Sequence, residues 1–302
     1  MTGIEQTLAL SRMTIEEAGG GNPVRLAAAI HAQVGKQGHT MGPVPVEAIA
    51  AALDIIEIRK EATENLEGAL VTTAERSVGS ILVNSASNHR RQRFTIAHEL
   101  GHYLNLWHTP TSGDGFACTK ADLRQAGSAS KPGLTRHQVQ ERQANRFAAE
   151  LLMPVSRMRP FLDRGPDIDA VLDLVDTLDC SRETMARRYA EQHEAAIAIV
   201  FSHKGRCRYG ISSAIFPRIG LRTGDPMPVL PTPQPGEAIS APIEADADDW
   251  INAKPSGASL TMQTLHQASG FAMTLLHLES DDPDEAHDME DAFERYTRFD
   301  RR

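Results

Sequence analysis

Residues Arg90–Trp107 read RRQRFTIAHELGHYLNLW, and this stretch decides how the rest of the chain is interpreted. Its apolar side chains recur every three or four residues, which predicts a core α-helix. The stretch contains His98-Glu99-Leu100-Gly101-His102, the pattern HExxH. Histidines four residues apart lie on one face of a helix, so His98 and His102 can bind a single metal ion. Glu99 can then accept a proton from a water molecule beside that ion.

A catalytic zinc ion needs a third protein ligand and one open position. We expect this ligand to be Glu141, which begins a second helical stretch, ERQANRFAAELLMP, at residues 141–154. Ala144 and Ala148 keep the face beyond Glu141 small, so the two helices can approach closely enough to share one ion. Two imidazoles and a carboxylate favour Zn²⁺, although Mn²⁺ or Fe²⁺ could occupy such a site.

Other residues near these helices leave alternatives open. The HExxH pattern also arises by chance, with its histidines at a helix surface or cap. Asn145 is expected to support the packing of a helix or a ligand rather than to bind the metal. Cys118 is interpreted as a half-buried loop residue, and the alternative is a thiolate that caps the metal and keeps an enzyme latent. Tyr103, His108 and His137 are each candidates for stabilising a tetrahedral intermediate.

The remaining patterns predict an α+β chain. We expect a flexible tail over residues 1–21 and a long polar connection over 109–133. The predicted helices cover residues 22–34, 44–53, 90–107, 135–153, 168–178 and 182–193. The predicted strands cover 54–58, a hairpin over 68–84, and then 195–203, 206–213 and 259–278.

Composition and charge exclude several classes of protein. The chain has 302 residues, of which 41% are hydrophobic and 24% charged, as in an ordinary globular protein. The longest apolar run has seven residues, too few to cross a membrane, and no secretory signal is visible. Three cysteines at irregular spacing indicate reduced thiols, so we expect a cytoplasmic protein. The segment 279–291 holds eight acidic residues and no lysine or arginine, which leaves a nearly neutral body and disfavours direct DNA binding.

The motifs RFTIAHELGHYL and ERQANRFAAELLMP resemble those of the ImmA/IrrE family of bacterial metallopeptidases. The resemblance implies a gluzincin-like fold in which His98, His102 and Glu141 bind zinc and Glu99 is the general base. Members of that family cleave helix-turn-helix repressors of the Xre type and thereby derepress stress or mobile-element genes. This resemblance therefore implies a protein substrate of that kind.

The radiation-response members of that family also suggest how this chain is divided. The expected parts are a tail (1–21), a zincin-like peptidase domain (22–160), a helix-turn-helix-like segment (161–194), a β-containing and GAF-like C-terminal domain (195–280) and an acidic tail (281–302). In the helix pair of residues 168–193, mixed charge favours packing or partner recognition over DNA binding.

Two other functions remain open. One is a regulator that binds DNA or a repressor and uses its metal only structurally, in which case Glu99 would serve no purpose. The other is a C-terminal domain that senses a ligand and gates the peptidase.

Overall fold

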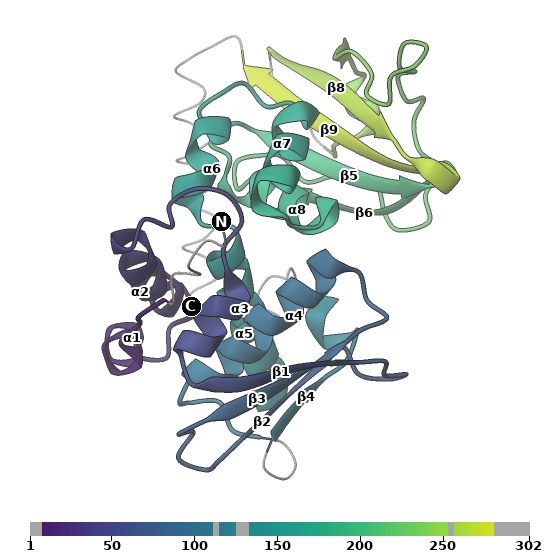
Figure 1. The fold of residues 1–302 in the computed structure, drawn as a ribbon. Helices are drawn as coiled ribbons and strands as arrows, with labels where there is room; N and C mark the ends of the chain where they lie inside the picture. Colours follow the sequence, from purple (N-terminus) through teal and green to yellow (C-terminus); the bar gives the residue numbers. More distant parts are fainter. Residues whose placement is uncertain (1–7, 111–114, 125–132, 253–256, 281–302) are drawn as a thin grey trace. The chain divides into compact units, whose positions relative to one another are not determined.

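The computed structural model describes residues 8–110, 115–124, 133–252 and 257–280 (Figure 1). It confirms an α+β chain and divides it into two compact units. The N-terminal unit comprises residues 1–157 and 176–181, and the C-terminal unit comprises residues 158–175 and 182–302. The predicted acidic tail of residues 281–302 lies outside the described residues.

A four-stranded sheet and its helices build the N-terminal unit. The helices are α1 (Arg12–Gly19), α2 (Pro23–Lys36), α3 (Val46–Ala52), α4 (His89–Leu104), the 3-10 turn η1 (Asp122–Arg124) and α5 (Arg136–Leu152). The strands are β1 (Ile55–Glu61), β2 (Gly68–Thr72), β3 (Gly79–Asn84) and β4 (Gly115–Cys118), in the order β1-β3-β2-β4. The predicted hairpin is confirmed, because β2 and β3 pair antiparallel. Strand β1 runs parallel to β3, and β4 pairs antiparallel with the other edge of β2.

Helix α4 is the centre of this unit. It packs on β2 and β3 on one side and against α3 and α5 on others. Every residue from Arg93 to Leu104 is buried as a result. Asn88 caps its first turn by accepting a hydrogen bond from the backbone N–H of Arg91. A helix buried on all sides holds its side chains in fixed positions, which a binding site requires.

Three parts of the sequence interpretation need correction. Residues 12–19 form helix α1 instead of a flexible tail, because Ser11 caps the helix and Ile15 is fully buried. The glycines that follow end this helix: Gly20 is left-handed at φ 51° and donates its N–H to the carbonyl of Glu16. The predicted polar connection contains strand β4, and a further helix, α6 (Val155–Leu162), follows Pro154.

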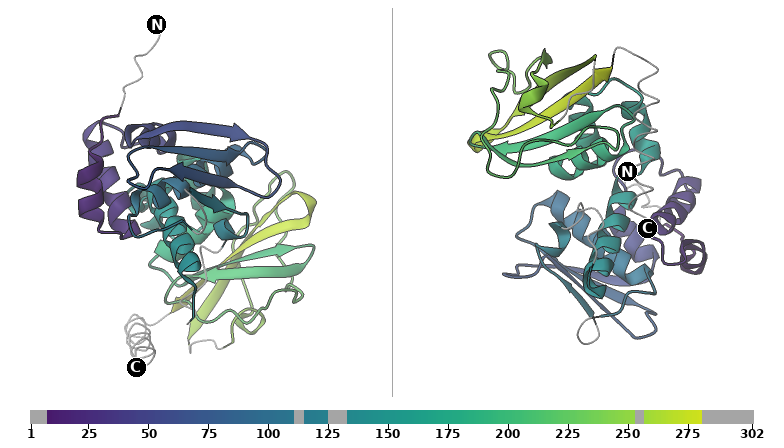
Figure 2. Two further views of the ribbon diagram at one scale, coloured as in Figure 1. Left: turned by 90° about the horizontal axis from the view of Figure 1, so that it is seen from below. Right: turned by 180° about the vertical axis from the view of Figure 1, so that it is seen from behind.

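An antiparallel sheet and helices, most of α6 among them, build the C-terminal unit (Figure 2). Its strands are β5 (Ile197–His203), β6 (Arg206–Ser212), β7 (Ile243–Glu244), β8 (Ala258–His266) and β9 (Phe271–Ser280), in the order β6-β5-β9-β8-β7. Helix α7 (Ile168–Leu178) precedes α8 (Arg182–Gln192), and α8 packs on β5 and β6. The 3-10 turns of this part of the chain are η2 (Ala247–Asp249) and η3 (Ala268–Gly270). A separate hydrophobic core includes Val200, Trp250 and Leu276. Among the described helices, none is long and apolar enough to span a membrane.

Candidate metal centre

Helix α4 presents His98 and His102 on one face, one turn apart. Their Nε2 atoms lie 3.1 Å from each other, and neither side chain is exposed to solvent. Helix α5 brings Glu141 to the same point: its Oε2 lies 3.2 Å from Nε2 of His98, and its Oε1 lies 3.3 Å from Nε2 of His102. The structure therefore brings together the three residues that the sequence proposed as metal ligands.

Small residues at the helix contact make this approach possible. Ala144 and Ala148 of α5 are fully buried, as expected for the inner face of this helix. Gly101 lies inside the HExxH pattern, and a Cβ atom there would be only 2.9 Å from the ring of Phe147. The missing side chain thus lets Phe147 pack directly on the backbone of α4.

A fourth donor, the thiol of Cys118, joins the group from strand β4. Its Sγ lies 3.2 Å from Nε2 of His98 and 3.9 Å from Nε2 of His102, and the side chain is fully buried. One donor atom from each of His98, His102, Cys118 and Glu141 lies within 4.8 Å of the others. Tetrahedral zinc with bonds of about 2.0–2.3 Å requires donor separations of roughly 3.3–3.6 Å. The separations given for the histidines with one another, with Glu141 and with Cys118 are 3.1–3.9 Å, so small adjustments would bring the four residues around such an ion.

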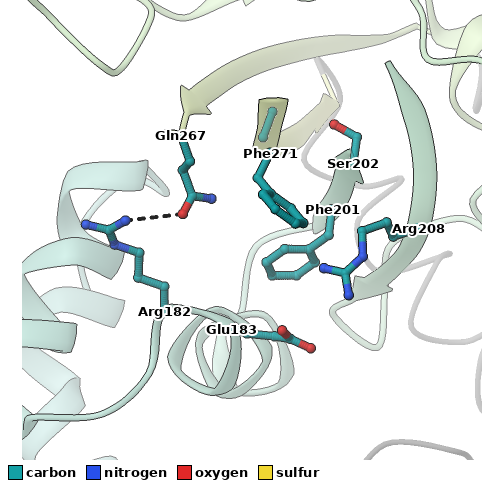
Figure 3. A pocket seen from close by; sticks show the side chains of 8 residues that line it. Arg182, Glu183, Phe201, Ser202, Arg208, Gln267 and Phe271 are labelled. Carbon is teal, nitrogen blue, oxygen red and sulfur yellow. Dashed lines mark hydrogen bonds between the residues drawn. The ribbon is translucent and has the colours of Figure 1, made fainter. Parts of the chain in front are cut away.

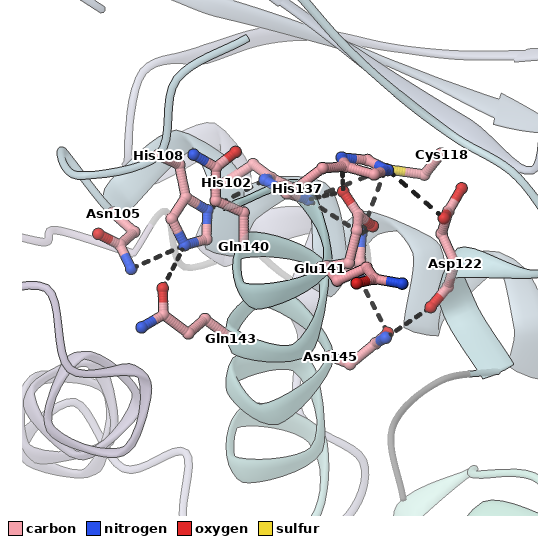
Figure 4. Close-up of polar contacts among 12 residues, drawn as sticks. His102, Asn105, His108, Cys118, Asp122, His137, Gln140, Glu141, Gln143 and Asn145 are labelled. Carbon is pink, nitrogen blue, oxygen red and sulfur yellow. Dashed lines mark hydrogen bonds and ion pairs between the residues drawn. The ribbon is translucent and has the colours of Figure 1, made fainter. Parts of the chain in front are cut away.

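Hydrogen bonds on the far side of each imidazole orient it for metal binding (Figure 4). Oδ1 of Asn145 lies 3.0 Å from Nδ1 of His98 and accepts its proton, which leaves the Nε2 lone pair free. Nδ1 of His102 lies 3.0 Å from Nδ1 of His108, whose Nε2 lies 2.9 Å from Oε1 of Gln143. The same Nε2 lies 3.0 Å from Nδ2 of Asn105, so the side chains of Gln143 and Asn105 both contact His108, which orients His102 from behind.

In this arrangement the lone pairs of His98 and His102 and the carboxylate of Glu141 face one another in a buried site. Burial lowers the pKa of His102 to about 3, so its ring is neutral near pH 7. Burial alone would raise the pKa of Glu141, but contacts with His102 and His98 lower it below its usual value. Oε2 of Glu141 is buried and accepts no hydrogen bond from any described residue. A cation between these groups would satisfy all of them.

Glu99 lies beside this group and is fully buried. The thiol of Cys118 is a hydrogen-bond neighbour of the Glu99 carboxyl group. Burial raises the pKa of Glu99 to about 7. Strand β2 covers this side chain closely, since a Cβ atom at Gly68 would lie 2.7 Å from Oε1 of Glu99. A carboxyl group with a pKa near neutrality is suited to accept and return a proton.

The structure separates the residues that the sequence left as alternatives. The hydroxyl of Tyr103 points away from the metal group and donates to the backbone oxygen of Arg76. His108 lies behind His102, as described above. His137 borders the group, because its Nδ1 lies 3.6 Å from Oε1 of Glu141 and its side chain is 39% exposed. Of these three candidates, only His137 combines solvent access with proximity to the ligands.

Arg76, in the turn between β2 and β3, is a supporting residue that the sequence analysis missed. Its side chain is buried and donates to the backbone oxygens of His102, Tyr103 and Asn105, at 2.7–3.0 Å, and to that of His108. These are carbonyl groups at and beyond the end of α4, where a helix leaves acceptors without partners. Nothing in the local sequence predicts this contact, because it joins a turn to a helix end 26 residues later.

Comparison with known proteins finds a family model that matches the part of the chain containing the metal group. Residues 55–190 match the family model of the IrrE N-terminal-like domain, Peptidase_M78. This part of the chain is similar to that family. The match contains α4, β4 and α5, so all four residues of the metal group lie within the IrrE N-terminal-like domain. The resemblance noted from the two motifs is thereby confirmed, and the matched family is one of metallopeptidases.

Individual relatives are more distant. Over 123 residues, the chain is 32% identical to the radiation response metalloprotease IrrE of Deinococcus radiodurans. That alignment covers 40% of this chain and a third of the relative's length. A solved structure of a Mycobacterium tuberculosis transcriptional regulator aligns with 86% of this chain and 89% of its own at 17% identity, with a TM-score of 0.47.

The C-terminal unit contains a separate, half-open cavity of about 230 Å³ (Figure 3). Phe201 and Phe271 line it together with Arg182 and Arg208. Arg182 donates to Oε1 of Gln267 at 3.2 Å, and the guanidinium of Arg208 lies 5.6 Å from the ring centroid of Phe271. Glu183 also lines the cavity, so two guanidinium groups and one carboxylate face it, and with the aromatic rings they suit a small planar ligand that carries negative charge.

Proposed function

We propose that the chain is a zinc-dependent endopeptidase. His98, His102 and Glu141 would hold the ion, and Glu99 would act as the general base. The observation that carries this proposal is the convergence of three ligand atoms beside the fully buried carboxyl group of Glu99. The thiol of Cys118 in the same group favours zinc over manganese or iron, because thiolates are soft ligands.

Each residue has a distinct task in this reaction. A bound zinc ion supplies Lewis-acid polarisation of the scissile carbonyl and makes water more acidic. Glu99 takes a proton from the attacking water and passes it to the leaving nitrogen. Asn145 would hold His98 in the tautomer that binds metal, and the ring of His108 orients His102 from its far side. His137 is positioned at the solvent side to stabilise the developing negative charge.

The substrate we propose is a helix-turn-helix repressor of the Xre type, whose cleavage derepresses stress or mobile-element genes. This rests on the ImmA/IrrE family and on the likeness to a radiation response metalloprotease. An extended substrate segment would bind as an added strand along the β2–β3 hairpin. We place the reaction in the cytoplasm, where the three buried thiols would stay reduced.

The finer division of the fold is part of the same proposal. It comprises a gluzincin-like peptidase domain, a helix-turn-helix-like segment at 161–194 and a GAF-like domain at 195–280. Five of the eleven residues of α8 are buried, including Arg188. This supports a packing role for the helix pair and argues against direct DNA binding.

The cavity of the C-terminal unit supports a sensory role for this unit. A thermal-shift screen with mononucleotides and aromatic carboxylates would test it, with Arg208→Ala as the control. We expect a planar anion to raise the melting temperature of the wild type but not of this variant. If no such compound stabilises the wild type, this cavity is not a sensor site for that class.

One observation favours a second function, a non-proteolytic regulator with a structural metal site. Four protein ligands are typical of structural zinc, whereas catalytic zinc keeps an open position. The cluster of two histidines, a cysteine and a glutamate has that number of donors. Glu99 distinguishes the two functions, because a structural site has no need of a buried base.

The deciding experiment compares new protein N-termini, by mass spectrometry, in cells that express the wild type or Glu99→Gln under DNA damage. We expect Glu99→Gln to keep its zinc and to lose cleavage of one helix-turn-helix repressor. Cleavage that persists in this variant would refute the peptidase mechanism. If zinc binds to both proteins and no terminus depends on Glu99, the structural-metal function is favoured.

A further inference from the structure

Strand β4 occupies the sheet edge that a substrate would use. It pairs antiparallel with β2, so that Cys118 lies opposite Gly68 and Phe116 lies opposite Leu70. Gly68 is also the residue that contacts Glu99. The chain's own segment therefore runs past the general base as an added peptide strand would.

Every second side chain of β4 points toward the metal group. Phe116 and Cys118 are buried, whereas Ala117 between them is exposed. The ring of Phe116 stacks on His102, with centroids 4.6 Å apart. The thiol of Cys118 lies 3.2 and 3.9 Å from the two Nε2 atoms, which brackets the sulfur–nitrogen separation of about 3.5 Å expected around tetrahedral zinc.

Two buried carboxylates give independent evidence that this is a ligand site. Oε2 of Glu141 accepts no hydrogen bond from the described residues, and the carboxyl group of Glu99 lies within hydrogen-bonding range of the thiol of Cys118. Both side chains are at least 98% buried. Buried carboxylate oxygens around a thiol are costly unless a cation or water satisfies them.

We propose that Cys118 is a fourth metal ligand and that β4 is an internal inhibitory strand. This inference rests on the zinc-peptidase function proposed above. With the thiolate bound, the ion has four protein ligands and no open position, and β4 blocks the edge of β2. Release of the strand would free both the metal position and the substrate edge, so inhibition and docking depend on one segment.

Contacts on both sides of Cys118 hold the strand in place. The backbone N–H of Glu67 donates to the carbonyl of Cys118 at 2.9 Å. After the strand, Asp122 accepts hydrogen bonds from the backbone and hydroxyl of Thr119. Asn145 donates to the carbonyl of Asp122 at 2.7 Å while it accepts from His98. Because Asn145 joins this segment to a ligand, displacement of the segment is coupled to the geometry of the site.

The strand is short enough to be released. It has four residues and pairs on one side with β2. Such a short edge strand contributes few ladder hydrogen bonds, and the metal–sulfur bond is then a large part of what retains it. Removal of the thiol alone should therefore shift the segment toward its released state.

Cobalt substitution tests the ligand directly, without any substrate. Co²⁺ bound to a thiolate has a charge-transfer absorption in the near ultraviolet that histidine and carboxylate ligands do not give. We expect this band in the Co²⁺-loaded wild type and its loss in Cys118→Ala and Cys118→Ser. Cys180→Ala and Cys207→Ala are matched controls, because both thiols are buried but lie outside the metal group, and they should keep the band.

The outcomes separate this inference from the proposed function. Stoichiometric Co²⁺ without the band in the wild type would overturn the role of Cys118 and leave the metal site of the peptidase intact. Failure of both wild type and Cys118→Ala to bind Co²⁺ would overturn the zinc-peptidase function itself. Metal content, measured on the same samples, tells these two results apart.

The inhibitory role needs a second measurement on the zinc-loaded proteins. Hydrolysis of a random peptide library, followed by mass spectrometry, should be at least about tenfold faster in Cys118→Ala than in the wild type, equivalent to about 1.4 kcal/mol. Cys180→Ala should match the wild type. Equal rates for wild type and Cys118→Ala, with the cobalt band present, would make Cys118 a ligand without an inhibitory role and overturn that part of the proposal.

Discussion

At the scale of single residues, Asn145 shows how a side chain that is not proposed as a ligand can control metal binding. It accepts the Nδ1 proton of His98 and thereby fixes the ring orientation and tautomer. We expect Asn145→Ala to weaken zinc binding by about 10–100-fold. Competition with a chromophoric chelator measures this change. Arg146→Ala is the control: its side chain is 44% exposed and pairs with Glu150, so zinc affinity should stay as in the wild type.

Gly68 is a second residue whose role is steric. A Cβ atom there would lie 2.4 Å from Cγ2 of Thr95 and 2.7 Å from Oε1 of Glu99. We expect Gly68→Ala to reduce the free energy of unfolding by about 1–3 kcal/mol, because strand β2 must move away from α4. Gly35→Ala in helix α2 meets no atom within 4 Å and should instead stabilise by roughly 0.5–1 kcal/mol. Chemical denaturation followed by circular dichroism compares them, and equal stability of the two variants would contradict the steric argument.

At the scale of elements, the end of α4 depends on the β2–β3 turn. Arg76 donates to four backbone oxygens at or after the last turn of this helix. We expect Arg76→Ala to destabilise the N-terminal unit by at least about 3 kcal/mol, because buried carbonyl groups lose their partners. Arg59→Ala on β1 is the comparison, since this side chain is 59% exposed, and its effect should remain within about 0.5 kcal/mol.

The sequence could predict the elements whose signals are local. The HExxH helix, the β2–β3 hairpin and the small inner face of α5 each have a clear period or spacing, and the structure contains them. Strand β4 could not be found in this way. Its four residues, Gly-Phe-Ala-Cys, have too short an alternation, and their partners in β2 lie 44 to 50 residues earlier in the chain.

Helix α1 was missed for a different physical reason. The run Gly19-Gly20-Gly21 was interpreted as the end of a frayed tail, although glycine equally ends a helix in left-handed geometry. The burial of Ile15 decides between the two, and burial is a tertiary property. Likewise, Cys118 is fully buried against His98 and is not a half-buried loop residue, because β4 turns it inward.

At the scale of the whole molecule, each unit has its own core, so metal should stabilise only one of them. Zinc at 100 times its dissociation constant adds about 2.7 kcal/mol to the unit that binds it. We expect a chelator to lower the calorimetric transition of the N-terminal unit. In Trp107→Phe, the buried Trp250 is the remaining tryptophan, so its fluorescence reports the unfolding of the C-terminal unit. The unfolding temperature of this unit should not change with the chelator. A decrease that matches that of the N-terminal unit would show that the two units unfold together.

Strand β4 also has a consequence for the solubility of the protein. A free sheet edge presents unpaired N–H and C=O groups, which recruit strands from other molecules and promote aggregation. While β4 is paired, the edge of β2 is protected; once it leaves, Leu70 and Val71 lie on an open edge. A released molecule without substrate would therefore be prone to self-association, and its working lifetime would be limited by the same strand movement that switches it on.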